Sequence, residues 1–239
     1  MSSLVEEILE RIRSRRSFAE SYVLLSFAQS LDGCIAYGGP SHKDRLILSG
    51  PKSMALTHAL RRSVDAVAVG INTVFSDDPL LTVRMDLQGA PFEPELQPAA
   101  VVFDSKLRFP FDSRLARNMR RRLIVVTLSG DNDLKLETHA SGLELLKIPG
   151  HERIDFKDAL NALKSLCAIH SLMVEGGASI IQSALPHADD LLITIAPCLL
   201  PGGLKAIDGG SHHPQLLSLR DPLVCHLDAD TIVYGTLVT

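Results

Sequence analysis

The stretch DAVAVGINTVFSDDPLLTVR, Asp65–Arg84, decides how the chain is expected to fold. It begins with a short apolar run that ends at Gly70, and such a run is typical of a strand buried on both faces. Short polar residues, two adjacent aspartates, a proline and an arginine follow. We therefore expect a loop after the strand, in which Pro79 restricts Asp78 to an extended conformation. The order of the charged residues suggests that this loop binds an anionic ligand and takes part in a proton transfer.

Apolar runs of the same kind recur along the chain, and helical patterns lie between some of them. The other predicted strands are residues 22–30, 99–105, 123–129, 172–177 and 191–200. The predicted helices are residues 3–16, the segment from Leu48 with Pro51 in its first turn, 156–170 and 178–188. This alternation predicts an α/β fold with a mostly parallel central sheet and helices on both faces. Residues 223–238 predict an antiparallel C-terminal strand pair.

The composition is that of an ordinary globular protein. Hydrophobic residues make up 46% of the chain, and no change in composition marks a linker, so we expect one domain over 1–239 with a helical extension at 1–20. The net charge of -4 argues against nucleic-acid binding. The cysteines show neither metal-ligand spacing nor a disulfide framework. No apolar run reaches the roughly 20 residues that cross a bilayer. We expect a cytoplasmic protein without a metal site or a membrane partner.

A second motif, VEGGAS at residues 174–179, stands between a predicted strand and a predicted helix. Glycines there let the backbone approach a ligand, and the first N–H groups of the helix can bind a phosphate. Two glycines alone are equally typical of a plain turn. Glu175 favours the functional interpretation, because a carboxylate at the end of a buried strand is costly without a partner.

Two arginines are candidates for binding an anionic ligand. Arg61 and Arg84 could each present a guanidinium fork to a phosphate group. The alternative is an ordinary polar turn, with Arg84 paired to Asp86 or exposed to solvent. The residues alone leave both interpretations open.

Five separated motifs together resemble one known family. They are SFAQSLDGCIA (26–36), residues 60–84, VVFDSKLRFP (101–110), LMVEGGASIIQSAL (172–185) and IAPCLLPGG (195–203). In this order they are similar to the reductase of riboflavin biosynthesis, which comprises the RibD C-terminal domain and stand-alone fungal and archaeal reductases. The resemblance implies a dihydrofolate-reductase-like fold, the cofactor NADPH and a homodimer. It also implies reduction of a ribosylaminopyrimidine 5′-phosphate to its ribitylamino form.

The resemblance also implies roles for individual residues. The implied cofactor-binding residues are Thr73, Asp77, Ser105, Gly176, Gly177, Ala178, Ser179 and Ile180. The implied substrate-binding residues are Arg61, Leu81, Arg84 and Glu175. Glu175 and Asp77 are the candidate catalytic residues, with Glu175 favoured because it ends a buried strand. Residues 41–45 fall near the family's substrate site, in a loose register.

Some features depart from the bacterial fused members of the family. Ser26 stands where many of those members have lysine, and the zinc signature of a deaminase does not occur. The chain is therefore expected to carry out the reduction alone. Two alternatives stay open: a related reductase of another pterin or pyrimidine, and a non-catalytic NADPH-binding module. The sequence leaves open whether the pyrimidine is the diamino or the deaminated form.

Overall fold

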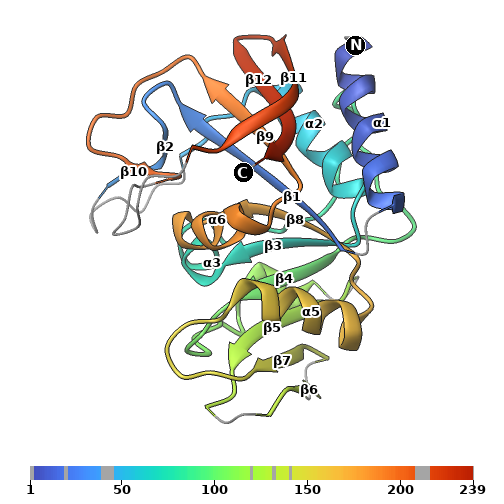
Figure 1. Cartoon of the computed structure of the whole chain (residues 1–239), viewed down its shortest axis with the longest axis vertical. Coiled ribbons are helices and arrows are strands. Elements are labelled where there is room, and N and C mark those ends of the chain that lie inside the picture. The colour runs from blue at the N-terminus through green and yellow to red at the C-terminus, as the bar shows by residue number, and fades with distance from the viewer. Residues whose placement is uncertain are drawn as a thin grey trace.

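A ten-stranded sheet forms the centre of the molecule (Figure 1). The computed structural model describes residues 3–18, 21–38, 46–118, 121–130, 133–139, 142–207 and 216–238, so the segment 41–45 lies outside it. The strand order is β11-β12-β9-β1-β8-β3-β4-β5-β7-β6. The parallel strands are β1 (Tyr22–Ser30), β3 (Ala66–Gly70), β4 (Ala99–Phe103), β5 (Leu123–Leu128), β7 (Glu144–Ile148), β8 (Ser171–Gly176) and β9 (Asp190–Ala196).

Antiparallel strands complete both edges of the sheet. They are β6 (Lys135–Thr138) at one edge, and β11 (Ser218–Leu227) and β12 (Asp230–Val238) at the other. A separate small sheet pairs β2 (Cys34–Ala36) with β10 (Leu204–Lys205). The predicted fold class, mostly parallel with an antiparallel C-terminal pair, is confirmed.

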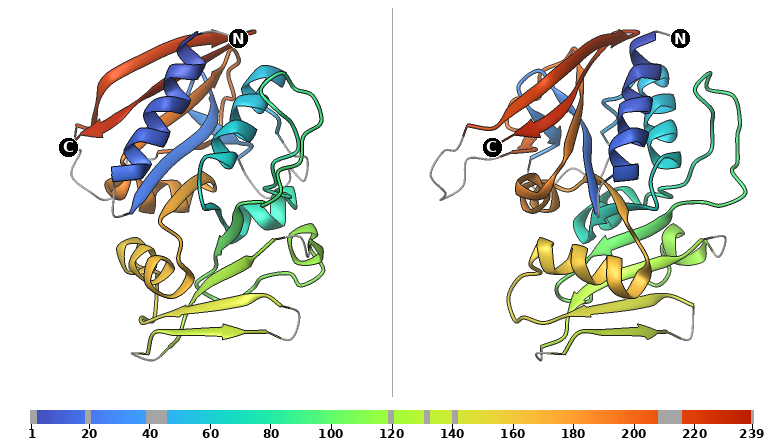
Figure 2. Two further views of the ribbon diagram at one scale, coloured as in Figure 1. Left: turned by 90° about the vertical axis from the view of Figure 1, so that its right-hand side faces the viewer. Right: turned by 45° about the vertical axis from the view of Figure 1, so that its right-hand side comes forward.

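Helices cover both faces of the sheet because side chains alternate along its strands. In β3, Val67 and Val69 belong to one apolar cluster, whereas Ala66 and Ala68 belong to the other. The first cluster lies under α1 (Ser3–Phe18), α2 (Pro51–Arg62) and α3 (Ile71–Asp77). The second lies under α5 (Phe156–Cys167) and α6 (Ala178–Ala184), which continues as the short 3-10 helix η1 (Leu185–His187). Figure 2 shows α1 and α2 side by side, away from α5 and α6. No described helix is long and apolar enough to span a bilayer.

The segment after β3 differs from its prediction. Residues 71–77 form the helix α3 and not a loop, because Ile71 and Val74 are buried one turn apart. Asp78 is not extended: it adopts a left-handed conformation with φ 38° and ends α3. Aspartate tolerates this conformation better than most residues, and its N–H bonds to the Val74 carbonyl at 3.0 Å. The Asp78 carboxylate then accepts the backbone N–H of Arg114, the first residue of α4 (Arg114–Arg117), at 2.8 Å.

The helix α1 is an integral part of the fold. Its apolar face is buried against α2 and β11. At its basic end, Arg15 Nε lies 3.2 Å from Oδ1 of the fully buried Asp190. Asp190 also accepts hydrogen bonds from the hydroxyls of Tyr22 at 2.8 Å and Tyr234 at 2.9 Å. Burial, reinforced by Asp190, raises the pKa of both tyrosines, so the hydroxyls keep their protons and go on donating.

Replacing Ile8 by alanine tests how strongly α1 contributes to stability. Ile8 is fully buried in the first apolar cluster, so Ile8→Ala should lower the free energy of unfolding by about 2–5 kcal/mol. Urea unfolding measures this change. The exposed Glu6, two residues earlier on the same helix, is the control, and Glu6→Ala should stay within about 0.5 kcal/mol of the wild type. Equal effects of the two substitutions would show that α1 is peripheral.

Candidate active site

The predicted cofactor residues gather at one edge of the sheet. The carboxyl ends of β8, β3 and β4 lie side by side, with Val69 opposite Gly176 and Gly70 opposite Phe103. Thr73 follows β3, Ser105 follows β4, and the glycine turn follows β8. Ligands of open α/β sheets bind at this edge. The fold therefore brings together three segments that lie up to about 100 residues apart in the sequence. This separation is much greater than the length of a strand.

Gly177 leaves room where α3 and α6 begin. It has a φ of 91°, and a Cβ on it would lie 3.0 Å from Thr73 Oγ1. A Cβ on Gly70 would lie 3.6 Å from Cγ2 of Ile180, so the first turns of the two helices are neighbours. In neither helix does a described side chain cap the N-terminus. Their first N–H groups are thus available to an anion.

The remaining predicted cofactor residues differ in their surroundings. Ser105 is partly exposed in the turn after β4. Asp77 accepts the Ser76 hydroxyl at 2.7 Å, at the end of α3. Ile180 is 6% exposed, and its N–H already donates to the Gly177 carbonyl at 3.1 Å. A ligand at this turn would therefore meet the N–H groups of Ala178 and Ser179, while Ile180 supports the turn by packing.

Glu175 has the partner that its position requires, and the partner is Arg61. Arg61 Nε donates to Oε1 of Glu175 at 2.6 Å, and Nη2 donates to Oε2 at 2.8 Å. The Arg61 Nη1 group donates to the Thr82 carbonyl at 2.8 Å. Only 10% of the Arg61 side chain and 14% of the Glu175 side chain are exposed. This two-pronged, nearly buried pair connects α2 to the end of β8, beside the glycine turn.

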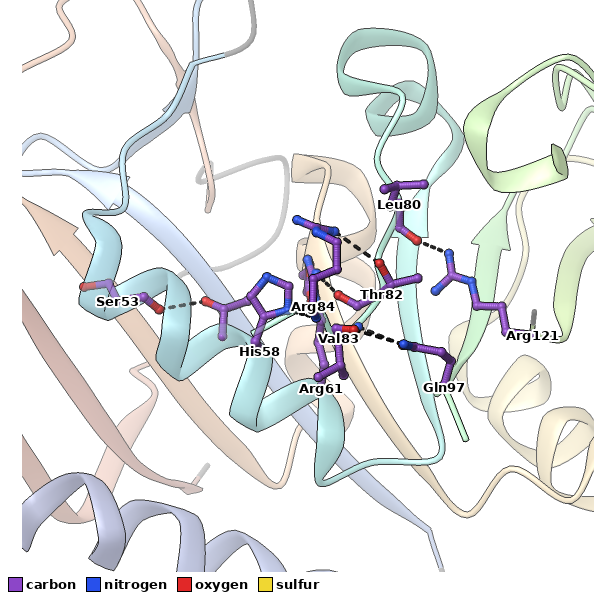
Figure 3. Close-up of polar contacts among 11 residues, drawn as sticks. Ser53, His58, Arg61, Leu80, Thr82, Val83, Arg84, Gln97 and Arg121 are labelled. Atoms are coloured by element: carbon purple, nitrogen blue, oxygen red, sulfur yellow. Dashed lines mark hydrogen bonds and ion pairs between the residues drawn. The ribbon is translucent and has the colours of Figure 1, made fainter. Parts of the chain in front are cut away.

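Arg84 lines a pocket. Figure 3 shows Arg84 beside Arg61, the arginine of this pair. Its Nη1 donates to Thr82 Oγ1 at 3.2 Å, and its backbone N–H donates to Nδ1 of His58 at 3.2 Å. Asp86 forms a turn of its own by accepting the N–H groups of Gln88 and Ala90, both at 2.9 Å. The pocket has a volume of about 520 Å³ and is lined by Thr82, Val83, Arg84, Pro91, Phe92, Glu93, Gln97 and Asn118.

Leu81 occupies a different position from the other predicted substrate residues. Its side chain is 2% exposed and packs in the first apolar cluster. Its φ of 52° gives the segment Leu80–Arg84 a sharp change of direction. Leu81 can therefore meet a ligand only through its backbone, and its side chain anchors the segment that carries Thr82 and Arg84.

Sequence reasoning missed two residues near the site, His58 and Arg121. His58 lies one turn before Arg61 on α2, so helical spacing could have placed the two on one face. Burial, with help from Arg61 and Arg84, lowers the pKa of His58 to about 4, so its ring is neutral and accepts the Arg84 N–H. Arg121 belongs to a basic run after residue 119 that reads as an ordinary surface segment. Nothing in that pattern indicates its burial.

The neutral His58 predicts a dependence of stability on pH. The pKa of His58 is about 4 in the folded protein against 6.5 in the unfolded chain. The stability that the neutral ring gives to the folded protein is therefore complete above pH 6.5 and is lost as the pH falls toward 4. The loss should be about 3 kcal/mol at 1.36 kcal/mol per pKa unit. Urea unfolding between pH 4 and 7 measures it. His58→Asn, which keeps an acceptor for the Arg84 N–H, should flatten the curve over this range; an unchanged slope would contradict the assignment.

Substitution of Gly177 tests the proposed approach of ligand to backbone. Gly177→Ala adds a Cβ 3.0 Å from Thr73 Oγ1 and imposes a positive φ on alanine, so NADPH affinity should fall about tenfold, as expected for strain of about 1–3 kcal/mol. Fluorescence titration measures the Kd. Gly89→Ala is the matched control, because Gly89 has a φ of 83° but no atom within 4 Å of the new Cβ. If both variants bind NADPH like the wild type, the turn does not hold the cofactor.

Comparison with known proteins shows which family this chain belongs to. The model of the family described as "RibD C-terminal domain" matches residues 21–233. The riboflavin biosynthesis protein RibD of Aquifex aeolicus is 33% identical over 89% of this chain and 57% of its own length. The 2,5-diamino-6-ribosylamino-4(3H)-pyrimidinone 5′-phosphate reductase of Methanothermobacter thermautotrophicus is 34% identical over 76% of this chain and 80% of its own. The chain spans about half the length of the first curated relatives it matches, at 57% and 46%.

Solved structures show the same fold. The riboflavin biosynthesis reductase Rib7 of Saccharomyces cerevisiae superposes with a TM-score of 0.73 at 25% identity, over 98% of this chain and 99% of that one. RibD of Acinetobacter baumannii gives a TM-score of 0.74 at 23% identity, over 93% of this chain and 60% of that one. The family match covers most of the chain and leads to one conclusion: this chain belongs to the RibD C-terminal domain family.

Proposed function

We propose that the chain is an oxidoreductase of riboflavin biosynthesis that reduces a ribosylaminopyrimidine 5′-phosphate to its ribitylamino form with NADPH. Relatives that this chain matches over most of its length carry the name of that reductase. The observation that carries the proposal is the Arg61–Glu175 pair, because it lies between the glycine turn and the pocket at Arg84. A simple cofactor-binding module needs neither the buried pair nor the arginine at the pocket.

The residues at the carboxyl edge fit a nicotinamide dinucleotide phosphate. The uncapped first turns of α3 and α6 would hold its phosphates through backbone N–H groups, and Gly177 leaves the space for that approach. Thr73, Asp77 and Ser105 would supply hydroxyl and carboxylate contacts around it. When bound, NADPH supplies a hydride from C4 of its nicotinamide, and the substrate accepts it at C1′ in its ring-opened imine form.

The protein's own part is to orient the substrate and to move protons. Ring opening takes a proton from the exocyclic nitrogen to the ring oxygen, and hydride addition then needs a proton on that nitrogen. Glu175 lies beside the glycine turn, so its carboxylate is our first candidate to exchange these protons. Arg61 fixes its orientation by holding both oxygens. Asp77 at the end of α3 is the second candidate.

Arg84 is proposed to bind the 5′-phosphate of the substrate. It lines the pocket of about 520 Å³, and its guanidinium is held in place by the Thr82 hydroxyl. Phe92, which also lines the pocket, offers an aromatic surface to a planar base, with the Arg62 guanidinium 4.7 Å from its ring centre. The pocket thus combines a phosphate ligand with an apolar wall, as a phosphorylated ribosylaminopyrimidine requires.

Other expectations from the sequence are proposals as well. We propose that residues 1–239 form one domain in which 1–20 extend the family core, since the family match begins at residue 21. We further propose a cytoplasmic location, as the composition indicates, and a homodimer, as the resemblance implies. Assays with both the 2,5-diamino and the deaminated pyrimidine phosphate would establish which one is the substrate.

Glu175→Gln is the sharpest test of the proposed function. Glutamine keeps the shape of the side chain but cannot exchange a proton, so kcat should fall at least about 100-fold while the Kd for NADPH changes little. Steady-state oxidation of NADPH with the ribosylaminopyrimidine phosphate measures kcat. Glu144→Gln is the matched control: Glu144 forms an equivalent fork with Arg122, both bonds 2.8 Å, between β7 and the start of β5. Near-normal kcat in Glu175→Gln would refute the proton-transfer role.

A further inference from the structure

Three guanidinium groups meet at one short segment, Leu80–Arg84: two come from other parts of the chain, and the third belongs to Arg84 itself (Figure 3). Arg61 donates to the Thr82 carbonyl, and Arg84 donates to the Thr82 hydroxyl. Arg121, which precedes β5, donates through Nη2 to the Leu80 carbonyl. Two guanidinium groups from separate parts of the chain thus hold the segment that contributes Thr82, Val83 and Arg84 to the wall of the pocket, and a third, that of Arg84, belongs to the segment itself.

Arg121 differs from Arg61 in its partners. Arg61 has a carboxylate on two of its nitrogens, whereas Nε and Nη1 of Arg121 are buried and hydrogen bond to no group in the part of the chain that the structure describes. Burial and the positive charge of Arg61 lower the pKa of Arg121 to about 10, and Glu175 opposes this shift. Unpaired buried donors on a cation are costly for a fold, which suggests that a ligand completes them.

The position of Arg121 indicates what the ligand is. Asn118, three residues earlier, lines the pocket together with Thr82 and Arg84. Among the described residues that line the pocket, the exposed Glu93 is the only carboxylate, and the nearly buried Glu175 is paired with Arg61. An anion with two negative charges, such as a phosphate monoester, matches the cationic groups of Arg84 and Arg121.

We propose that Arg121 is a further phosphate ligand of the substrate site, acting beside Arg84. On binding, its Nε and Nη1 groups donate to the phosphate oxygens, while Nη2 keeps its bond to the Leu80 carbonyl. This inference rests on the proposed function for the identity of the substrate, but it can be tested with a simpler phosphate ester. None of the motifs that mark the family includes Arg121, so the site gains a residue that those motifs do not indicate.

Calorimetric titration of the full chain with ribose 5-phosphate, with ribose as the uncharged comparison, tests the proposal. The wild type should bind ribose 5-phosphate and not ribose. Arg121→Met keeps the aliphatic stem but removes the charge, and it should weaken ribose 5-phosphate binding about 10–100-fold, as expected for losing a charge-assisted hydrogen bond. Arg117→Met is the control, because Arg117 is an exposed arginine of the neighbouring α4, and its binding should match the wild type.

Urea unfolding without ligand separates this role from a structural one. If Arg121 serves a ligand, Arg121→Met should unfold at the same urea concentration as the wild type or a higher one, because it removes a buried unpaired cation. Arg121→Lys, which keeps the charge but not the fork, should bind ribose 5-phosphate with an affinity between those of the wild type and Arg121→Met.

Three results would overturn the proposal. The first is a wild type that does not bind ribose 5-phosphate, and the second is an Arg121→Met variant that binds it as the wild type does. The third is an Arg121→Met variant that fails to fold or unfolds earlier, which would assign Arg121 to the fold. If ribose 5-phosphate binds as expected but the ribosylaminopyrimidine phosphate is not reduced, the proposed function fails and the phosphate site stands.

Discussion

The two-pronged ion pair between Arg61 and Glu175 is the interaction on which the rest of the site depends. It connects α2, which packs on one face of the sheet, with the end of β8, from which α6 continues onto the other face. The same arginine holds the Thr82 carbonyl and so fixes the start of the pocket wall. One guanidinium group thereby links the strand end beside the glycine turn to the pocket wall.

The burial of this pair has an energetic consequence. Removing water from an arginine and a glutamate costs several kcal/mol per ion, and their mutual attraction offsets this cost only when the geometry is favourable. The distances of 2.6 and 2.8 Å meet that condition. A well-packed apolar pair would hold the fold as well, so the charges are better explained by the ligands that they orient. The buried donors of Arg121 follow the same logic on the other side of the segment Leu80–Arg84.

Much of the fold could be predicted from the sequence. The central strands are apolar on both faces, so their positions follow from the pattern alone, as for residues 22–30, which match β1. The strands β6 and β7 carry charged residues and lack that pattern, so the sequence did not predict them. The helix α3 was not predicted because it has seven residues with only two buried positions, which give no clear helical periodicity of apolar residues. The geometry of Asp78 was wrong because its hydrogen bonds to Val74 and Arg114 outweigh the restriction imposed by Pro79.

Only part of the candidate site could be predicted from the sequence. A carboxylate at the end of a buried strand demands a partner, but nothing local identifies Arg61, which lies 114 residues away. Leu81 was expected at the substrate, yet its side chain packs in the core and supports the segment from behind. His58 and Arg121 owe their unusual surroundings to burial by distant segments, which a pattern of neighbouring residues does not encode.

A double-mutant cycle on kcat/KM tests most directly whether Arg61 and Glu175 act as one unit. The cycle compares the wild type with Arg61→Gln, Glu175→Gln and the double variant, using NADPH and the ribosylaminopyrimidine phosphate. If the pair is the organising unit of the site, the double variant should be no slower than the slower single variant, because either change already disrupts the pair. If instead the two losses multiply, the residues act independently and the central role of the pair is contradicted.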